Sequence, residues 1–246
     1  MTQMTETHPG AGPIGRALAL VGGGVFVAAL GTFAACYAWV YGADAGPWTR
    51  ATAVPAVAID LALFSVFALH HSVFARTGLK TWVATVVDQC MERSTYVWIA
   101  SLMFVAVLLL WQPVGGTLWR VDGPGRYALW TLQALGVLIT IRASGQIDPL
   151  DLAGIRQAFG QRTSRPQELS RRGLYGLVRH PIYLGWILIV WPTPLMTGTR
   201  LVFAAVSTIY LMIAIPFEER SLVKTFGEEY RDYARQVRAR MIPFLY

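Results

Sequence analysis

The sequence predicts an all-α protein that crosses a membrane several times, and three features predict this fold class. Of 246 residues, 54% are hydrophobic and only 14% are charged, whereas about 25% are charged in an ordinary soluble domain. The hydrophobic residues are also grouped into long stretches. Several approach the roughly 20 helical residues that cross a hydrocarbon core of about 30 Å. None alternates with a period of two, so helices are the expected spanning form.

Six apolar segments are expected to form helices in or at the membrane. In order they cover residues 17–41, 55–75, 95–112, 127–141, 182–195 and 200–217. The fourth and fifth are short for a complete crossing, so a tilted, re-entrant or hairpin arrangement stays open for each. We expect a single membrane domain over residues 1–246. Its four N-terminal helices lie in 17–141, and a polar loop, a helical hairpin and a polar tail follow in 142–246.

The positions of Lys and Arg predict the orientation of these helices, because both collect in the cytoplasmic loops of membrane proteins. If both termini are cytoplasmic, 17 Lys and Arg residues fall on the inner side and four on the outer side. The outer four are Arg50, Arg120, Arg126 and Arg200. We therefore expect cytoplasmic termini. The net charge of +7 then faces anionic lipid headgroups, and no nucleic-acid partner is needed to explain it.

The first apolar segment permits one alternative, a cleaved signal peptide. Phe33-Ala34-Ala35-Cys36 is similar to a lipoprotein cleavage site, but the length of the segment and its single upstream Arg favour a membrane helix. The two cysteines and four histidines have no spacing that would build a metal site or a disulfide framework. We expect no metal.

Polar residues whose side chains could bind a ligand or take part in a reaction gather around the last two apolar segments. Arg179-His180-Pro181 precedes the fifth segment, and Pro181 suits the first position of a helix. The N–H groups of that first turn carry positive dipole character that favours a carboxylate. The chain turns at 192–198 and returns to Glu218-Glu219. Because the two arms have similar lengths, we expect both carboxylates at the depth of His180 and Tyr183. Each part alone has a simpler explanation, as a charged helix start and a solvated helix end.

The whole string from residue 171 to residue 243 is more specific than its parts. It contains Arg-His-Pro-x-Tyr-x-Gly from Arg179, Glu-Glu-x-x-Leu from Glu218, and Phe-Gly-x-x-Tyr-x-x-Tyr from Phe226. This pattern closely resembles the isoprenylcysteine carboxyl methyltransferase superfamily of integral-membrane methyltransferases. The resemblance implies that the C-terminal helical hairpin and its flanking segments bind S-adenosylmethionine and release S-adenosylhomocysteine.

The resemblance also implies which residues contact the cofactor. His180, Pro181, Ile182 and Tyr183 would line it, with Tyr175 and the backbone near Leu169 closing over its adenosyl part. Glu218, with Glu219 beside it, would be the acidic contact. A carboxylate there can accept hydrogen bonds from the ribose or the ammonium, or balance the sulfonium charge.

One departure from the family pattern bears on the substrate. Members that methylate a carboxylate carry basic residues in the turn before the paired acids. Here the turn is Met212-Ile213-Ala214-Ile215-Pro216-Phe217, with no basic residue. A substrate carboxylate would be an unpaired charge against an apolar wall, which is costly. We therefore expect a different acceptor from a prenylcysteine carboxylate.

Three motifs in the front part of the chain extend the resemblance. They are similar to the bacterial branch that contains methanethiol S-methyltransferase. The motifs are Leu69-His70-His71-Ser72-Val73-Phe74-Ala75-Arg76, Met91-Glu92-Arg93-Ser94-Thr95-Tyr96-Val97 and the run from Asp148 to Gln157. Ionisable groups near a membrane boundary are functional by default, so His70, His71, Glu92 and Asp151 are the catalytic candidates. A helix-start charge pair and histidines facing headgroups are the simpler alternatives. Asp60 is expected to be a hydrogen-bond partner between helices.

The expected function is transfer of a methyl group from S-adenosylmethionine to a small apolar thiol at the cytoplasmic face of a bacterial-type inner membrane. Only the thiolate is a strong nucleophile, so His70 or His71 is expected to act as the base. The alternatives are a lipophilic isoprenoid or phospholipid acceptor, or a non-catalytic membrane accessory protein. A transporter is disfavoured because, apart from Asp60, almost nothing ionisable lies inside the apolar segments. The oligomeric state stays open.

Overall fold

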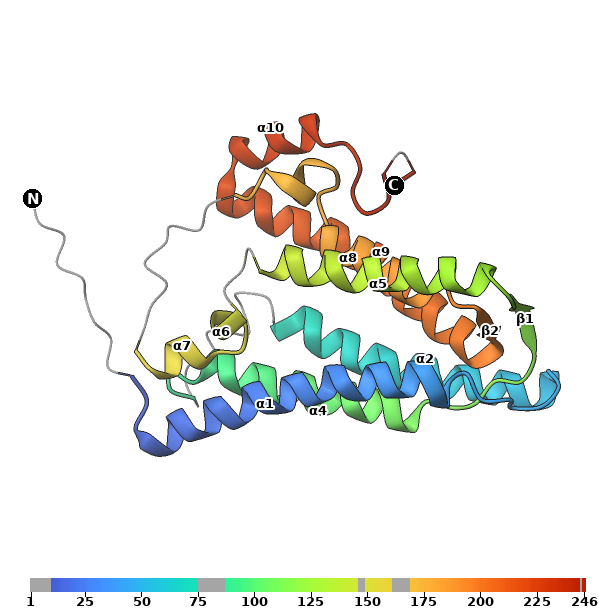
Figure 1. Cartoon of the computed structure of the whole chain (residues 1–246). Helices are drawn as coiled ribbons and strands as arrows, with labels where there is room; N and C mark the ends of the chain where they lie inside the picture. The colour runs from blue at the N-terminus through green and yellow to red at the C-terminus, as the bar shows by residue number, and fades with distance from the viewer. Residues whose placement is uncertain (1–9, 75–86, 146–148, 161–168, 244) are drawn as a thin grey trace, which may run out of the picture. The chain divides into compact units, whose positions relative to one another are not determined.

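The computed structural model describes residues 10–74, 87–145, 149–160, 169–243 and 245–246 (Figure 1). Several residues of the sequence motifs fall outside this range: Ala75, Arg76, Lys80, Asp148, Arg162 and Arg165. The described chain forms two compact units, each assembled from three separate stretches. Unit 1 contains Met1–Cys36, Ser65–Trp111 and Ile147–Pro166; unit 2 contains Tyr37–Phe64, Gln112–Gln146 and Gln167–Tyr246. Neither unit is continuous in sequence, and the expected single domain stays a prediction.

Unit 1 is built on helix α1 (Pro13–Ala35), the end of α2 (Arg50–Phe74) and helix α4 (Glu92–Leu110). Two short helices, α6 (Pro149–Leu152) and α7 (Ile155–Ala158), follow later in the chain. Glycine allows α1 and α4 to approach closely, as small residues do between membrane helices. The indole of Trp98 covers Gly22 and donates a hydrogen bond of 2.9 Å to the carbonyl of Leu18.

Unit 2 holds the rest of the helices and a small antiparallel sheet. It begins within the π-helical turn η1 (Cys36–Val40) and contains the first part of α2. Its later elements are β1 (Thr117–Arg120), α5 (Gly125–Ser144), the 3-10 turn η2 (Gly173–Gly176), α8 (Pro181–Val190), β2 (Leu195–Thr197), α9 (Gly198–Phe226) and α10 (Glu228–Gln236). Strands β1 and β2 pair, with Thr117 opposite Thr197.

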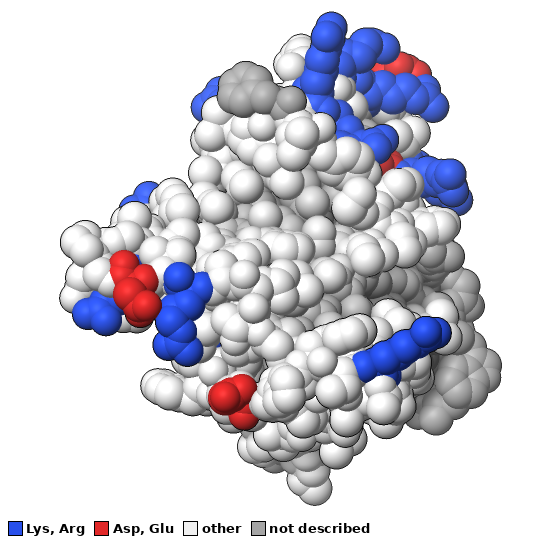
Figure 2. Space-filling model, turned by 90° about the vertical axis from the view of Figure 1, so that its right-hand side faces the viewer, with Lys and Arg blue, Asp and Glu red and all other residues white. Residues whose placement is uncertain are grey.

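The predicted helical membrane fold is confirmed, because each of the six apolar segments contains a helix. Four helices are long and apolar enough to cross a membrane within the described ranges: Pro13–Val40, Arg50–Ser72, Glu92–Leu110 and Gly198–Phe226. The fifth segment gives the short α8 of 10 residues. Large apolar side chains stay exposed along these helices, including Val27, Val66 and Leu109. Figure 2 shows a face on which charged atoms are confined to a few places.

The two arms of the hairpin differ in helix length, although similar lengths were expected. Helix α8 has 10 residues and α9 has 29. Residues 191–197 join the two helices, and the last three of them, Leu195–Thr197, form the strand β2. Pro216 was expected near the end of its helix, yet α9 continues past it to Phe226. Proline lacks one N–H donor, and the helix retains its other bonds.

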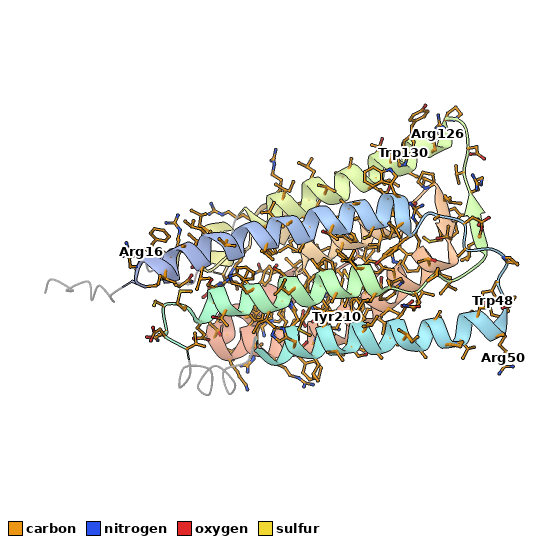
Figure 3. All side chains as sticks on the ribbon, turned by 90° about the horizontal axis from the view of Figure 1, so that it is seen from below. Arg16, Trp48, Arg50, Arg126, Trp130 and Tyr210 are labelled. Carbon is orange, nitrogen blue, oxygen red and sulfur yellow. The ribbon has the colours of Figure 1, made fainter. Side chains whose placement is uncertain are left out.

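One end of unit 2 has the composition of a membrane surface. Trp and Tyr side chains are exposed there, as in the aromatic belts of membrane proteins: Trp39, Trp48, Trp119, Tyr127 and Trp130. Figure 3 shows Trp48 with Arg50, and Trp130 with Arg126, at this end of the unit. The same view places Tyr210 midway along α9, and Arg16 in unit 1 in the first turn of α1.

Arg200, at the start of α9, is buried at this end of unit 2 with 7% of its surface exposed. Its guanidinium donates to the carbonyls of Tyr37, Ala38 and Leu195, at 2.6–3.0 Å, and to the hydroxyl of Thr193 at 3.2 Å. Carbonyls at the end of a helix have no partner within it and carry negative dipole character. Arg200 therefore caps the first span and ties it to the α8–α9 turn.

Candidate functional site

His180 is the residue that begins helix α8, and its position follows from the local sequence. Pro181 occupies the first helical turn, and the residue before a proline is restricted to non-helical conformations. Val178, two residues earlier, is completely buried, which holds the segment leading into α8 in place. The His180 ring is 6% exposed and stacks on the ring of Tyr183, with centroids 5.2 Å apart. The first turn of α8 thus presents an imidazole and a phenol side by side.

Glu218, on α9, meets both of these rings. The Tyr183 hydroxyl donates a hydrogen bond of 2.7 Å to its carboxylate, and Nδ1 of His180 lies 3.6 Å from the same oxygen. The Glu218 side chain remains 45% exposed. The expected meeting of a carboxylate with His180 and Tyr183 is therefore present, although 35 residues separate Tyr183 from Glu218.

Glu219 has a different environment, with only 14% of its side chain exposed. One carboxylate oxygen accepts from Nε of Arg179 at 2.7 Å and lies 3.4 Å from Nε2 of His180. The other oxygen lies 3.3 Å from Nε of Arg240. Both oxygens of Glu219 are thus occupied by arginines. Successive helical residues face different directions, which separates the surroundings of the two acids.

Two tyrosines, Tyr175 and Tyr233, lie next to this cluster. The Tyr233 hydroxyl, on α10, donates a hydrogen bond of 2.8 Å to the carbonyl of Tyr175 in η2. Burial raises the pKa of Tyr233 to about 12. Burial and the nearby Glu218 carboxylate raise the pKa of Tyr175. Both tyrosines are therefore neutral at physiological pH. Tyr230 beside them is 3% exposed.

The remaining cofactor candidates have less specific positions. Pro181 is buried and Ile182 half-buried in the first turn of α8. Leu169 is half-buried and directly follows residues 161–168, which lie outside the described part of the chain. All eight candidates belong to unit 2, and His180, Tyr183, Glu218 and Glu219 form its connected centre.

The four catalytic candidates all lie in unit 1. The Tyr96 hydroxyl is 2.7 Å from Nδ1 of His71, so a hydrogen bond joins α4 to the end of α2. The ring of His70 stacks on Tyr96 at 5.7 Å between centroids, and Phe67 stacks on His71. Two imidazoles therefore share one phenol.

Asp151 and Glu92 lie beside the start of α4. Asp151 accepts a hydrogen bond of 2.6 Å from Gln157, and its other oxygen is 3.9 Å from Arg93. Gly154, with φ of 74°, packs directly on the backbone of Ser94, where a Cβ would collide. Glu92 is half-buried in the first turn of α4. The structure thus brings Asp151 close to Arg93 in the first turn of α4.

Sequence reasoning omitted Arg179, Arg240, Tyr96 and Tyr233 from the site, although the structure connects each to a candidate. Arg179 immediately precedes His180, so its position in the sequence could have indicated that it belongs to the site. Arg240 is 21 residues beyond Glu219, and only the tertiary fold reveals their pairing. Among the described residues, no three His, Cys, Asp or Glu side chains are arranged to hold a metal ion.

Known proteins are similar to this chain in sequence. Residues 127–229 match the family model for phospholipid methyltransferase. The methanethiol S-methyltransferase of Crocosphaera subtropica is 42% identical over 196 residues, which are 78% of this chain and 76% of that protein. That of Mycobacterium tuberculosis is 40% identical over 186 residues, 74% of this chain and 76% of that protein. Nurim of Xenopus laevis is 29% identical over 170 residues, which are 64% of this chain and 59% of that protein. No solved structure matches the chain significantly.

Proposed function

The chain belongs to the methanethiol S-methyltransferase family of membrane methyltransferases, and on this premise we propose that it methylates a small thiol with S-adenosylmethionine as donor. Methanethiol is the first candidate acceptor. We place the reaction at the cytoplasmic face of a bacterial-type inner membrane, because 17 of the 21 Lys and Arg residues fall on that side in the predicted orientation. The observation that carries the cofactor assignment is the meeting of Glu218 with His180 and Tyr183 at the start of α8.

The residues at this point suit a cationic donor. When bound, S-adenosylmethionine supplies a methyl group on a positively charged sulfur. The exposed oxygens of Glu218 can accept hydrogen bonds from its ammonium or ribose, and its negative charge complements the cation. The rings of His180, Tyr183 and Tyr175 provide flat faces, while Pro181 and Ile182 add apolar contact at the helix start. The helix N-terminus favours the donor's carboxylate. Leu169 is proposed to close this side through its backbone.

The acceptor needs little from the protein beyond alignment, exclusion of water and removal of one proton. A thiol becomes a strong nucleophile only as thiolate. We propose His71 as the base. In the tautomer whose Nδ1–H donates to the Tyr96 hydroxyl oxygen, Nε2 has the lone pair that accepts the thiol proton. His70, stacked on the same tyrosine, is the second candidate. Glu92 and Asp151 are proposed as polar groups that complete the acceptor side.

A lipophilic acceptor is the second candidate function, and the phospholipid methyltransferase model that matches residues 127–229 favours it. The turn before the paired acids is compatible with either acceptor, because neither acceptor is a carboxylate that needs a basic residue there. Met212, Ile213 and Phe217 are exposed there and carry no charge. A carboxylate acceptor would find no cation in this turn.

A methyl-transfer assay on detergent-purified protein tests the proposal directly. Labelled S-adenosylmethionine is offered with methanethiol, with a larger thiol, or with a lipid extract. Label in dimethyl sulfide is the expected result. Label only in lipid would keep the donor site and replace the acceptor. Binding of S-adenosylhomocysteine without any transfer would contradict the enzymatic function and support a non-catalytic accessory role.

A further inference from the structure

A strap of the chain after α10, residues 237–242, lies directly against the residues that begin α8. The amide of Arg179 donates to the carbonyl of Ala239 at 3.0 Å, and the amide of His180 donates to the carbonyl of Arg240 at 2.8 Å. The strap is itself held in shape, since the amides of Met241 and Ile242 both donate to the carbonyl of Tyr246. Its backbone therefore fixes the backbone of His180.

Arg179 connects the strap to α9 and to the end of α10. Its Nε pairs with Glu219 at 2.7 Å, and its Nη1 donates to the carbonyls of Ala234, Val237 and Arg238 at 2.9–3.2 Å. These carbonyls belong to the last turn of α10 and the residues beyond it, where partners within the helix run out. The side chain of Arg179 is 7% exposed. A buried guanidinium thus satisfies a helix end and a carboxylate together.

Glu219 receives the second arginine from the strap itself. Arg240 lies 3.3 Å from its free carboxylate oxygen and also covers the ring of Tyr246. The Glu219 carboxylate is therefore enclosed by Arg179, Arg240 and His180, while the neighbouring Glu218 keeps 45% of its side chain exposed. Of the two paired acids, Glu218 is the one whose carboxylate is open to a ligand.

We propose that Glu219, Arg179 and Arg240 are positioning residues that clamp the strap onto the start of α8, and that Glu219 acts on the donor through His180 rather than by contact. This proposal deepens the proposed function and rests on it, because it assigns different roles to the paired acids: Glu218 contacts the donor, and Glu219 holds the strap in place. Loss of the clamp releases the His180 backbone from the strap and moves the imidazole relative to Glu218. Donor affinity then falls although no contacting group has been removed.

A double-mutant cycle on the full-length, detergent-purified chain separates contact from positioning. The variants are Glu219→Gln, Arg240→Gln and the pair together, and the readout is the Kd for S-adenosylhomocysteine. Each single change is expected to weaken binding about tenfold, and the double variant to be no more than about twofold weaker than either, because coupled residues do not add. Arg235→Gln removes the same charge from an exposed ion pair with Asp232 and is the matched control, expected within twofold of the wild type.

If the two losses multiply to about a hundredfold, Glu219 acts independently of the strap and the proposal is overturned. Hydrogen exchange gives a second readout that needs no ligand. Glu219→Gln is expected to speed exchange at least tenfold in peptides covering residues 179–180 and 237–242, and to leave α5 unchanged. Unchanged exchange in the strap refutes the clamp in any case. A wild-type chain that fails to bind S-adenosylhomocysteine while exchange responds as expected would sink the proposed donor and leave the clamp standing.

Discussion

At the scale of single residues, adjacent side chains of the same type occupy different environments. Glu218 is open and touches Tyr183, whereas Glu219 is enclosed by arginines. His71 is hydrogen-bonded to Tyr96, whereas His70 stacks on its ring. Neighbours on a helix point about 100° apart, which separates the surroundings of the two acids, whereas both histidines contact Tyr96 in different ways.

Glu218→Gln keeps the size of the side chain and removes its charge. Hydrogen bonds to a charged group contribute about 1.5–3 kcal/mol, so we expect S-adenosylhomocysteine to bind about 10- to 100-fold more weakly, measured by calorimetry. Glu228→Gln removes a carboxylate from an exposed pair with Arg231 and is expected to leave the Kd unchanged. Equal affinities of the Glu218 variant and the wild type would remove Glu218 from the donor site.

His71→Gln tests the base. General-base catalysis contributes about 10²- to 10⁴-fold, so kcat at neutral pH is expected to fall by at least about 100-fold with methanethiol as acceptor. The deficit should shrink as pH rises, because more of the thiol is then thiolate without help. The steady-state rate is measured from neutral to alkaline pH, with His70→Gln as the comparison. A deficit that is constant across pH contradicts the assignment of His71 as base.

At the scale of elements, the close contact of α5 with α8 holds the helix that presents His180. Gly136 and Gly185 face each other, and a Cβ on Gly136 would lie 2.7 Å from the carbonyl oxygen of Gly185 and 2.8 Å from Cβ of Leu188. Gln133 adds a hydrogen bond of 2.7 Å to the carbonyl of Ile189. The backbones approach closely because neither glycine has a side chain.

Gly136→Ala is expected to force these helices apart and to lower the free energy of unfolding by about 1–3 kcal/mol. Gly31→Ala is the matched control, since a Cβ on this helical glycine of α1 meets nothing within 4 Å. Alanine has the higher helix propensity, so the control is expected to be neutral or stabilising by up to about 1 kcal/mol. Thermal unfolding in detergent measures both. A Gly136 variant as stable as the control would contradict the described packing.

Helix α10 makes the stability of the fold sensitive to alkaline pH. Burial raises the pKa of Tyr233 from 10.0 to about 12, so between these values the folded state keeps a proton that the unfolded state loses. The stabilisation from this group is complete below about pH 10 and is lost as pH rises through 12, and the two-unit difference in pKa corresponds to a loss of at most about 3 kcal/mol. Thermal midpoints from pH 8 to 11.5 are expected to fall more steeply for the wild type than for Tyr233→Phe. Parallel curves would show that Tyr233 does not contribute.

At the scale of the whole molecule, apolar stretches and long motifs were predictable from the sequence, whereas contacts made by residues outside those motifs were not. The apolar stretches predicted every long helix, because length and composition alone decide what can cross a membrane. The Arg-His-Pro and Glu-Glu motifs predicted the meeting of His180 with Glu218. The pairing of Arg240 with Glu219 was not predicted, because the sequence of the C-terminal tail does not indicate which part of the fold it packs against. The β1–β2 pair was missed because strands of 4 and 3 residues show no measurable alternation.

The orientation of the chain can be tested with two matched exposed acids in unit 2. In a background in which Cys36 and Cys90 are replaced by Ser, we expect Asp122→Cys to react with a membrane-impermeant maleimide added outside intact cells. Glu228→Cys is expected to react only after the membrane is opened. Helix α9 is long enough to place its two ends on opposite sides of the membrane, because the 20 helical steps from Gly198 to Glu218 span about 30 Å, the thickness of the hydrocarbon core. The reverse labelling pattern would invert the predicted topology.

The capping of η1 by Arg200 determines how this part of the sequence can vary. The Arg200 guanidinium binds mainly main-chain carbonyls, which every amino acid possesses. Substitutions of the side chains at positions 38 and 195 therefore leave these hydrogen bonds in place. Position 42 is not free, because a Cβ on Gly42 would fall onto the guanidinium. Saturation mutagenesis should therefore give a tolerant profile at positions 38 and 195 and an intolerant one at 42 and 200. One arginine thus restricts substitution at its own position and at Gly42, while the positions that offer it only a main-chain carbonyl tolerate substitution.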